Sequence, residues 1–154
     1  MKNAIIAVLF IIATLPAFAR LGETEDQCVA RYGPVVLRDT DSSPLKLPLL
    51  AFAKNGFTFG ALMLNAKVGL LTIQKTDKSS FSDNELDLFL AANSAGQKWI
   101  RSDDISVNQD WVRDDGAKAE YNPFAHTFGF ASKEYLAAMA EATKADETKK
   151  TSGF

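Results

Sequence analysis

The chain has 154 residues, 47% of them hydrophobic and 23% charged, with a formal net charge of −2 at pH 7. This length and composition predict one globular domain with a single core. The slight acidity disfavours nucleic acid and anionic membranes as partners, while one cysteine and one histidine exclude an internal disulfide, a CxxC redox pair and a histidine-rich zinc site.

Residues 1–19 have the three parts of a secretory signal peptide. Lys2 provides the positive start, an apolar run extends from Ala4 to Leu15, and the small residues Ala17 and Ala19 precede the cleavage point. The run is shorter than the roughly 20 apolar residues that span a bilayer. No cysteine directly follows the cleavage point to carry a lipid anchor. We therefore expect cleavage after Ala19, export to the periplasm or the cell exterior, and a mature chain that is neither lipid-anchored nor transmembrane.

The first element of the mature chain is predicted to be a short helix. Thr24 and Gln27 have the spacing of a capping box, and the Gly33-Pro34 pair is typical of a helix end. These signals predict a helix from Glu25 to Tyr32. Cys28 lies four residues before Tyr32 on the same helix face, so we expect it to be a small buried residue.

The residues around this helix are similar to two groups of exported proteins. The match to the first-helix motif of the SmpA/OmlA (BamE-like) outer-membrane assembly lipoproteins is carried by Gly22, Thr24, Gln27, Cys28, Tyr32, Gly33 and Pro34. The segment also resembles the mature start of short exported bacterial proteins of unknown function, through residues 20–24, 27–28 and 31–33. The first resemblance implies a helix packed on a sheet, and the second implies an exported location without an activity. The chain lacks the lipoproteins' cysteine at the mature start and their aromatic strand after the helix.

The next segment, residues 45–73, is strongly apolar and is interrupted by turn signals. The Asn55-Gly56 pair predicts a two-residue hairpin between residues 49–54 and 57–64. A second turn near Asn65 returns the chain through residues 68–75, which gives a three-stranded meander. Neither face of this meander is wholly polar, so we expect helices on one face and the later hairpin or a partner protein on the other.

A second helix is predicted from Asp83 to about Ala95. Ser82 and Glu85 form another capping box, and apolar residues at helical spacing point one face toward the sheet. Asn93 ends this apolar face, where its amide is expected to cap the last carbonyls rather than reach a ligand.

The second half of the chain is predicted to contain a further hairpin, another strand and a final helix. The Asp115-Gly116 turn joins residues 111–113 to residues 117–121. Residues 124–130 alternate large and small side chains, which predicts a strand with His126 half-buried in an aromatic row and hydrogen-bonded through a ring nitrogen. The helix is expected from Lys133 to about Glu147, and residues 148–154 are expected to form a flexible tail.

Motifs that carry chemistry are few. The sequence contains no nucleophile elbow, glycine-rich phosphate loop or HExxH motif. A dyad of Cys28 and His126 would need both side chains within hydrogen-bond reach. Five acids without EF-hand spacing are interpreted as loop and turn residues. These acids are Asp103, Asp104, Asp110, Asp114 and Asp115.

The sequence thus predicts a single α+β domain over residues 20–147, with an antiparallel sheet of about five or six strands and three helices. Its expected role is non-enzymatic and needs no cofactor: an exported protein that binds another envelope protein or assists assembly. One alternative is a small-ligand module with a pocket between the sheet and the helix that starts after Ser82. Its contact residues would be Trp99, Trp111 and Tyr121. The other alternative is a hydrolase that uses aspartates.

Overall fold

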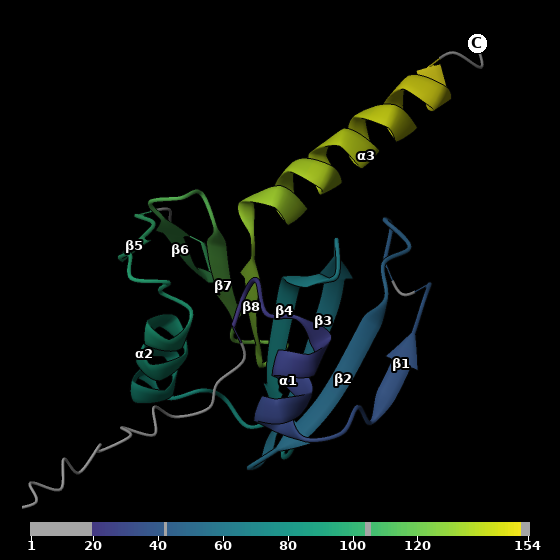
Figure 1. The fold of residues 1–154 in the computed structure, drawn as a ribbon. Coiled ribbons are helices and arrows are strands. Elements are labelled where there is room, and N and C mark those ends of the chain that lie inside the picture. Colours follow the sequence, from purple (N-terminus) through teal and green to yellow (C-terminus); the bar gives the residue numbers. More distant parts are fainter. Residues whose placement is uncertain (1–19, 42, 104–105, 152–154) are drawn as a thin grey trace, which may run out of the picture.

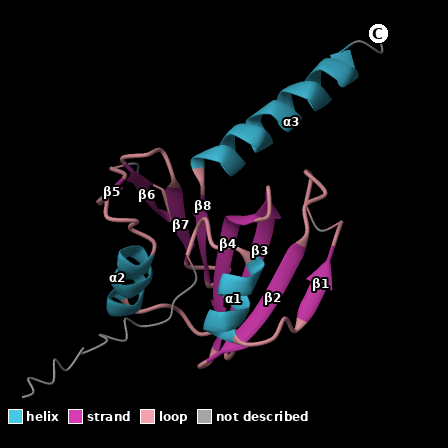
Figure 2. Cartoon of the chain, in the orientation of Figure 1, coloured by secondary structure: helices cyan, strands magenta, loops and turns pink. Residues whose placement is uncertain are grey.

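The computed structural model describes residues 20–41, 43–103 and 106–151, so the predicted signal peptide lies outside the described residues. Within these ranges the chain forms one eight-stranded antiparallel sheet and three helices (Figures 1 and 2). The strands are β1 (Leu37–Asp39), β2 (Leu49–Lys54), β3 (Phe57–Leu64), β4 (Lys67–Lys75), β5 (Trp99–Arg101), β6 (Gln109–Arg113), β7 (Lys118–Asn122) and β8 (Thr127–Ala131). The helices are α1 (Glu25–Tyr32), α2 (Asp83–Ala92) and α3 (Lys133–Thr151). None of these helices is both long and apolar enough to cross a membrane.

The sheet consists of two halves with the same order of elements. In each half a helix precedes a four-stranded meander, α1 with β1 to β4 and α2 with β5 to β8. The strand order is β1-β2-β3-β4-β8-β7-β6-β5, so the two meanders meet where β4 pairs with β8. Both α1 and α2 begin with a complete capping box, at Thr24 and at Ser82. The fold therefore repeats one helix-and-meander unit, although no long repeat is visible in the sequence.

The predicted number of strands was wrong, because the sheet has eight strands rather than five or six. The two missed strands are β1 and β5, which form the outer edges of the sheet. Each has only three residues and is mostly exposed, so neither shows an apolar run or an alternating pattern. We had expected the later hairpin or a partner protein to cover the other face of the first meander. The second meander instead continues the same sheet, because β8 pairs with β4.

The helix predictions agree closely with the structure. Helix α1 has the predicted bounds, whereas α2 ends at Ala92, three residues early. Asn93 is the C-cap of α2, and its side-chain Nδ2 donates a hydrogen bond to the Phe89 carbonyl at 3.1 Å, which confirms the predicted capping role. Helix α3 continues to Thr151, so residues 148–151 of the expected tail are helical, and residues 152–154 lie outside the described residues.

The predicted turns are present, but the strand expected at residues 124–130 begins later. Asn55 and Gly56 have φ values of 51° and 81°, as a two-residue hairpin of type I′ requires. Strand β8 starts only at Thr127, because residues 123–126 form the turn after β7 and His126 has a φ of 51°. Phe124 is therefore 80% exposed and does not extend the aromatic row. His126 is half-buried as predicted, and its Nδ1 lies 3.1 Å from the Ser80 hydroxyl.

The hydrophobic core lies between the sheet and the two helices α1 and α2, which cover the same face (Figure 2). Aromatic rings fill the space beneath α2. Phe89 of the helix lies edge-on to Phe128 of β8 at 6.4 Å, and Phe81 contacts both rings. Cys28 of α1 belongs to the same core and is 1% exposed, which confirms that it is a buried residue.

The opposite face of the sheet is covered only at one end. Tyr135, Leu136 and Met139 in the first turns of α3 pack with leucines of the meander and with Ala131. The rest of α3 extends away from the sheet (Figure 1). Among the residues that the structure describes, no helix covers the centre of this face.

Candidate functional site

Small and polar residues form a row across the uncovered face. The strand register places Ala51, Gly60, Thr72, Gly129, Glu120 and Asp110 side by side, on β2, β3, β4, β8, β7 and β6. Their neighbours along each strand point to the core, since side chains alternate between the two faces. Phe59, Phe128 and Trp111 are three such buried neighbours. We call this row the central row.

The surface is hollowed along the central row. One hollow of about 330 Å³ lies between the sheet and α3, where Leu70, Ala131 and Leu136 meet Lys118 and Glu120. A second of about 190 Å³ lies over β2, β3 and β4. Both are lined by Thr72 and Thr127, so they lie side by side across the strands, and we call the two together the central trough. It reaches from β7 to β2, a span of about 19 Å at the usual spacing of strands.

The two glycines of the trough differ in their packing. A Cβ atom at Gly60 would lie 2.7 Å from the Thr72 hydroxyl, so packing itself requires glycine there. A Cβ at Gly129 would have its nearest neighbour at 3.8 Å, and the backbone of Gly129 has no positive φ. Glycine within a strand lowers stability relative to a residue with a side chain. Neither backbone geometry nor packing thus explains Gly129, but it does keep the trough open.

Two acids lie directly opposite each other at the β6 end of the central row. Asp110 and Glu120 are register partners, and like charges in this position repel each other. The Asn108 side chain donates a hydrogen bond to Glu120 Oε1 at 2.8 Å. Lys118 lies on the same face, two residues before Glu120, but forms no ion pair with either acid within the described ranges. The local charge at this end is therefore negative.

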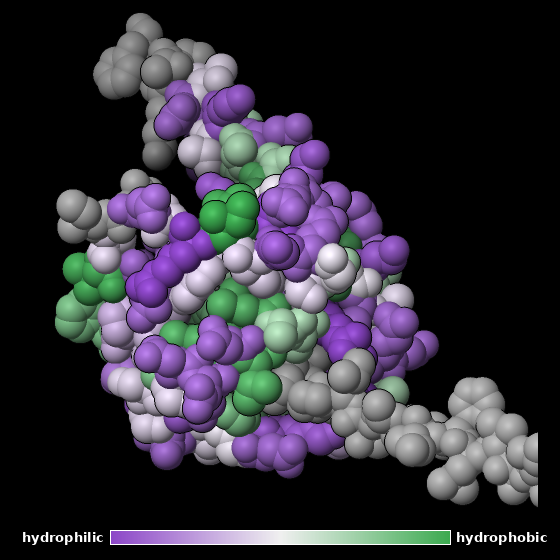
Figure 3. All heavy atoms as spheres, turned by 90° about the vertical axis from the view of Figure 1, so that its left-hand side faces the viewer, coloured by the Kyte–Doolittle hydropathy of each residue, from purple (hydrophilic) through white to green (hydrophobic). Residues whose placement is uncertain are grey.

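Exposed apolar side chains continue from this end toward the sheet edge. Ile100 of β5 and Val112 of β6 are register partners with exposures of 61% and 42%, and Val107 in the intervening loop is 63% exposed. Figure 3 views the molecule from the side of α2 and β5. There the hydrophobic residues form a group near the middle, framed by hydrophilic ones, and a smaller group at one margin.

The three aromatic residues predicted as ligand contacts do not line the trough but contact the core. The Tyr121 hydroxyl accepts a hydrogen bond from the Phe81 backbone at 3.2 Å, and the Trp111 ring lies 5.6 Å from that of Phe128. Trp99 is half-buried at the sheet edge, where its Nε1 donates to the Leu90 carbonyl at 2.8 Å. The space between the sheet and α2 is filled by aromatic rings.

The predicted acidic residues are dispersed. Asp115 forms a two-point ion pair with the buried Arg113, whose guanidinium also donates to the Asn93 carbonyl. The hydrogen bonds from Arg113 hold the pKa of Asp115 below its usual range. Asp103 and Asp114 are exposed, and Asp104 lies outside the described residues. Of the opposed pair, Glu120 lines the hollow beside α3 and Asp110 does not, so the hollow does not lie between the two carboxyl groups, as a substrate bound between paired acids would require.

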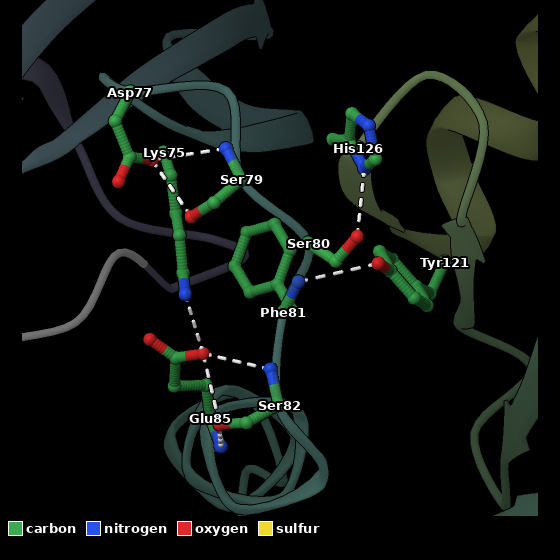
Figure 4. Close-up of polar contacts among 9 residues, drawn as sticks. All are labelled: Lys75, Asp77, Ser79, Ser80, Phe81, Ser82, Glu85, Tyr121 and His126. Atoms are coloured by element: carbon green, nitrogen blue, oxygen red, sulfur yellow. Dashed lines mark hydrogen bonds and ion pairs between the residues drawn. The ribbon is translucent and has the colours of Figure 1, made fainter.

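A network of polar contacts joins the loop between β4 and α2 to the turn after β7 (Figure 4). Lys75 pairs with Glu85 at 2.8 Å, and Glu85 also accepts hydrogen bonds from the backbone and hydroxyl of Ser82. Burial opposes ionisation of Glu85, but these contacts outweigh it and lower the pKa of its carboxyl group. Asp77 accepts hydrogen bonds from Ser79, and no acid within the described ranges pairs with His126, so the contact of Ser80 with His126 has no triad acid there.

Cys28 and His126 lie in different parts of the fold: Cys28 in α1 and His126 in the turn after β7. Burial raises the pKa of the Cys28 thiol to about 11, and the nearby Glu23 carboxylate adds to this effect. Such a thiol is not the reactive thiolate that nucleophilic catalysis requires. His126 lies in the turn after β7, where its Nδ1 contacts the Ser80 hydroxyl.

Comparisons with known protein families, with curated protein sequences and with solved structures find no match to this chain. The candidate site therefore rests on its geometry. Sequence reasoning identified one strand of it, since it noted the small residues that alternate with the phenylalanines around Thr127 and Gly129. It interpreted Asp110 as a loop or turn residue and did not pair it with Glu120, nor did it bring Gly60 and Thr72 to the same site, because only the strand register places these residues together.

Proposed function

We propose that this protein is an exported, non-enzymatic binding module that holds another envelope protein in the central trough. The observation that carries the proposal is the one-sided cover of the sheet: α1 and α2 pack on one face, while the middle of the other is open. An antiparallel sheet can leave a polar face to solvent, but leucines and alanines line part of this face beside the polar residues. A partner protein can supply the layer that the chain itself does not provide.

The composition of the trough suits a protein partner. Leucines and alanines lie beside threonine hydroxyls and the charged side chains of Lys118 and Glu120. Mixed apolar and polar surfaces of this kind are typical of non-obligate protein interfaces. The glycine at position 129, which the fold itself does not need, keeps the floor accessible.

The beginning of the folded domain supports export. The Leu21 backbone N–H donates to Asn93 Oδ1 at 3.0 Å, and the Gly22 N–H donates to the Val68 carbonyl at 2.9 Å. The chain is thus bound into the domain from the second residue after the predicted cleavage point.

Site-specific photo-crosslinking in the native cells tests this function. A photoreactive residue replacing Thr127, in the floor of the trough, should give one discrete protein adduct. The same residue replacing Asp87, which is exposed on α2, should not give that adduct. Adding Gly129→Val to the Thr127 variant should remove it. Equal adducts from both positions, or an adduct that ignores Gly129→Val, would contradict the proposal.

The export step has its own test. N-terminal sequencing of the protein recovered from outside the cytoplasm should begin at Arg20. A protein that keeps residues 1–19, or that stays in the cytoplasm, would contradict this part of the proposal without affecting the crosslinking result.

A further inference from the structure

We infer that the trough takes an extended segment of a partner protein, with a basic side chain at the β7 end of the trough, beside Glu120 and Asp110, and a large apolar side chain beneath α3. This inference rests on the proposed function and specifies the chemistry of the partner. It depends on three features of the trough: its charge, its larger hollow and its direction across the strands.

The charge of one end selects a basic side chain. Asp110 and Glu120 are adjacent on neighbouring strands, and their repulsion has no compensating ion pair within the described chain. An arginine or lysine placed between them would relieve this repulsion and form charge-assisted hydrogen bonds. Lys118 lies on the same face, two residues before Glu120, so this part of the surface carries one positive and two negative charges.

The hollow beneath α3 selects an apolar side chain. Leu70, Ala131 and Leu136 provide its apolar wall, and the backbone of Gly129 forms part of its floor. Its volume of about 330 Å³ admits a large aliphatic or aromatic side chain. Burial of such a side chain contributes the largest favourable contact that a short segment can make. Glu120 lines the same hollow, so the apolar and basic side chains would lie close together in the segment.

The direction of the trough favours an extended segment. It crosses the strands from β7 to β2, a distance of about 19 Å that about six extended residues would span. Gly129 lets a backbone approach the floor closely, and the hydroxyls of Thr58, Thr72 and Thr127 offer hydrogen-bond partners to its peptide groups. The Thr72 hydroxyl already donates to the Gly60 carbonyl at 3.3 Å, so its oxygen remains able to accept.

Selection from a random linear peptide library tests the inference. The mature chain, residues 20–154, serves as the target, and peptides that also bind the Gly129→Val protein are discarded. The remaining peptides should share an arginine or lysine at a fixed short spacing from a large apolar residue. Their affinity should fall at least tenfold in the Asp110→Asn/Glu120→Gln protein and should weaken with added salt.

Two further proteins make the result specific. The control Asp87→Asn/Asp146→Asn removes two exposed acids from α2 and α3 and should leave the affinity unchanged. The charge reversal Asp110→Lys/Glu120→Lys should instead select peptides with an acidic residue at the position of the basic one.

The possible outcomes separate the two proposals. Trough-binding peptides without a basic residue, or with apolar residues at helical spacing, overturn the inferred partner chemistry but leave the proposed function in place. The absence of any peptide that distinguishes Gly129→Val also overturns the inference. The proposed function itself is overturned by the crosslinking outcomes given above, not by the peptide selection.

Discussion

Thr72 on β4 and Gly129 on β8 face each other in register, on the strand pair that joins the two halves of the sheet. At this position a hydroxyl group lies beside a backbone without a side chain. The central row thus crosses the seam between the two repeated units at a position with room for a side chain.

Substitution of Gly129 separates stability from binding. Gly129→Val should raise the free energy of unfolding by about 0.5–1 kcal/mol, because a β-branched residue suits a central strand and the site has room for its Cβ. The same change should block the trough and abolish the Thr127 crosslink. Urea unfolding measures the first effect. A loss of stability would show that Gly129 is needed for packing after all.

The control for this variant lies on the opposite side of the molecule. Ala30→Leu adds an aliphatic side chain to the exposed surface of α1. It should leave both the crosslink and the free energy of unfolding nearly unchanged, since leucine is a good helix former.

Neutralising the opposed acids should not destabilise the fold. Asp110→Asn/Glu120→Gln removes a repulsion between register partners and keeps an acceptor for the Asn108 side chain, so stability should rise by about 0.2–1 kcal/mol. The gain should shrink in high salt, which screens exposed charges. Urea unfolding at two ionic strengths checks this. A clear loss of stability would mean that the acids serve the fold rather than binding.

How much of this fold the sequence predicts depends on the range of the interactions. The caps at Thr24 and Ser82 and the turn at Asn55-Gly56 were predicted correctly, because each signal lies within four residues of chain. The pairing of β4 with β8 joins segments more than fifty residues apart, and no local pattern specifies it. The edge strands were missed because three exposed residues have no periodicity.

The candidate site was less accessible to sequence reasoning than the fold. The central row takes one residue from each of six strands, and its members are individually unremarkable small or polar residues. Trp99, Trp111 and Tyr121 drew attention as large aromatic residues, yet all three contact the core. Aromatic side chains contribute so much burial that their presence alone does not distinguish a core from a binding surface.

Asn93 connects the end of α2 to the beginning of the domain. Asn93→Ala should lower the free energy of unfolding by about 1–2 kcal/mol, because it leaves the partly buried Leu21 N–H without its acceptor. Amide exchange at Leu21 should accelerate more than exchange in β8. The neighbouring substitution Ser94→Ala serves as the control and should change neither quantity appreciably. Unchanged exchange at Leu21 would contradict this role.

Cys28 should make the protein sensitive to alkaline conditions. Burial raises the pKa of the thiol to about 11 in the folded state, above its ordinary value of 9.0. Its contribution to stability is therefore complete below pH 9 and is lost as the pH rises toward 11. Burial raises the pKa of Tyr32 as well, so both groups act in the same direction. Unfolding measured from pH 8 to pH 11 should show this decline.

Two comparisons test the role of Cys28. Cys28→Ala should reduce the alkaline decline, although the tyrosine contribution remains. At pH 8 a thiol reagent should label the folded protein far more slowly than the urea-unfolded protein. Equal rates would show that Cys28 is accessible.

The position of β8 between β4 and β7 determines when the sheet can close. It is the last strand in the chain but one of the two central strands of the sheet, so the inner edge of β4 stays unpaired until residues 127–131 are available. Unpaired strand edges promote association between chains, and pairings distant in sequence form slowly. The N-terminal meander is therefore prone to association until β8 has been synthesised. A chain truncated before β8 would expose that edge of β4 permanently.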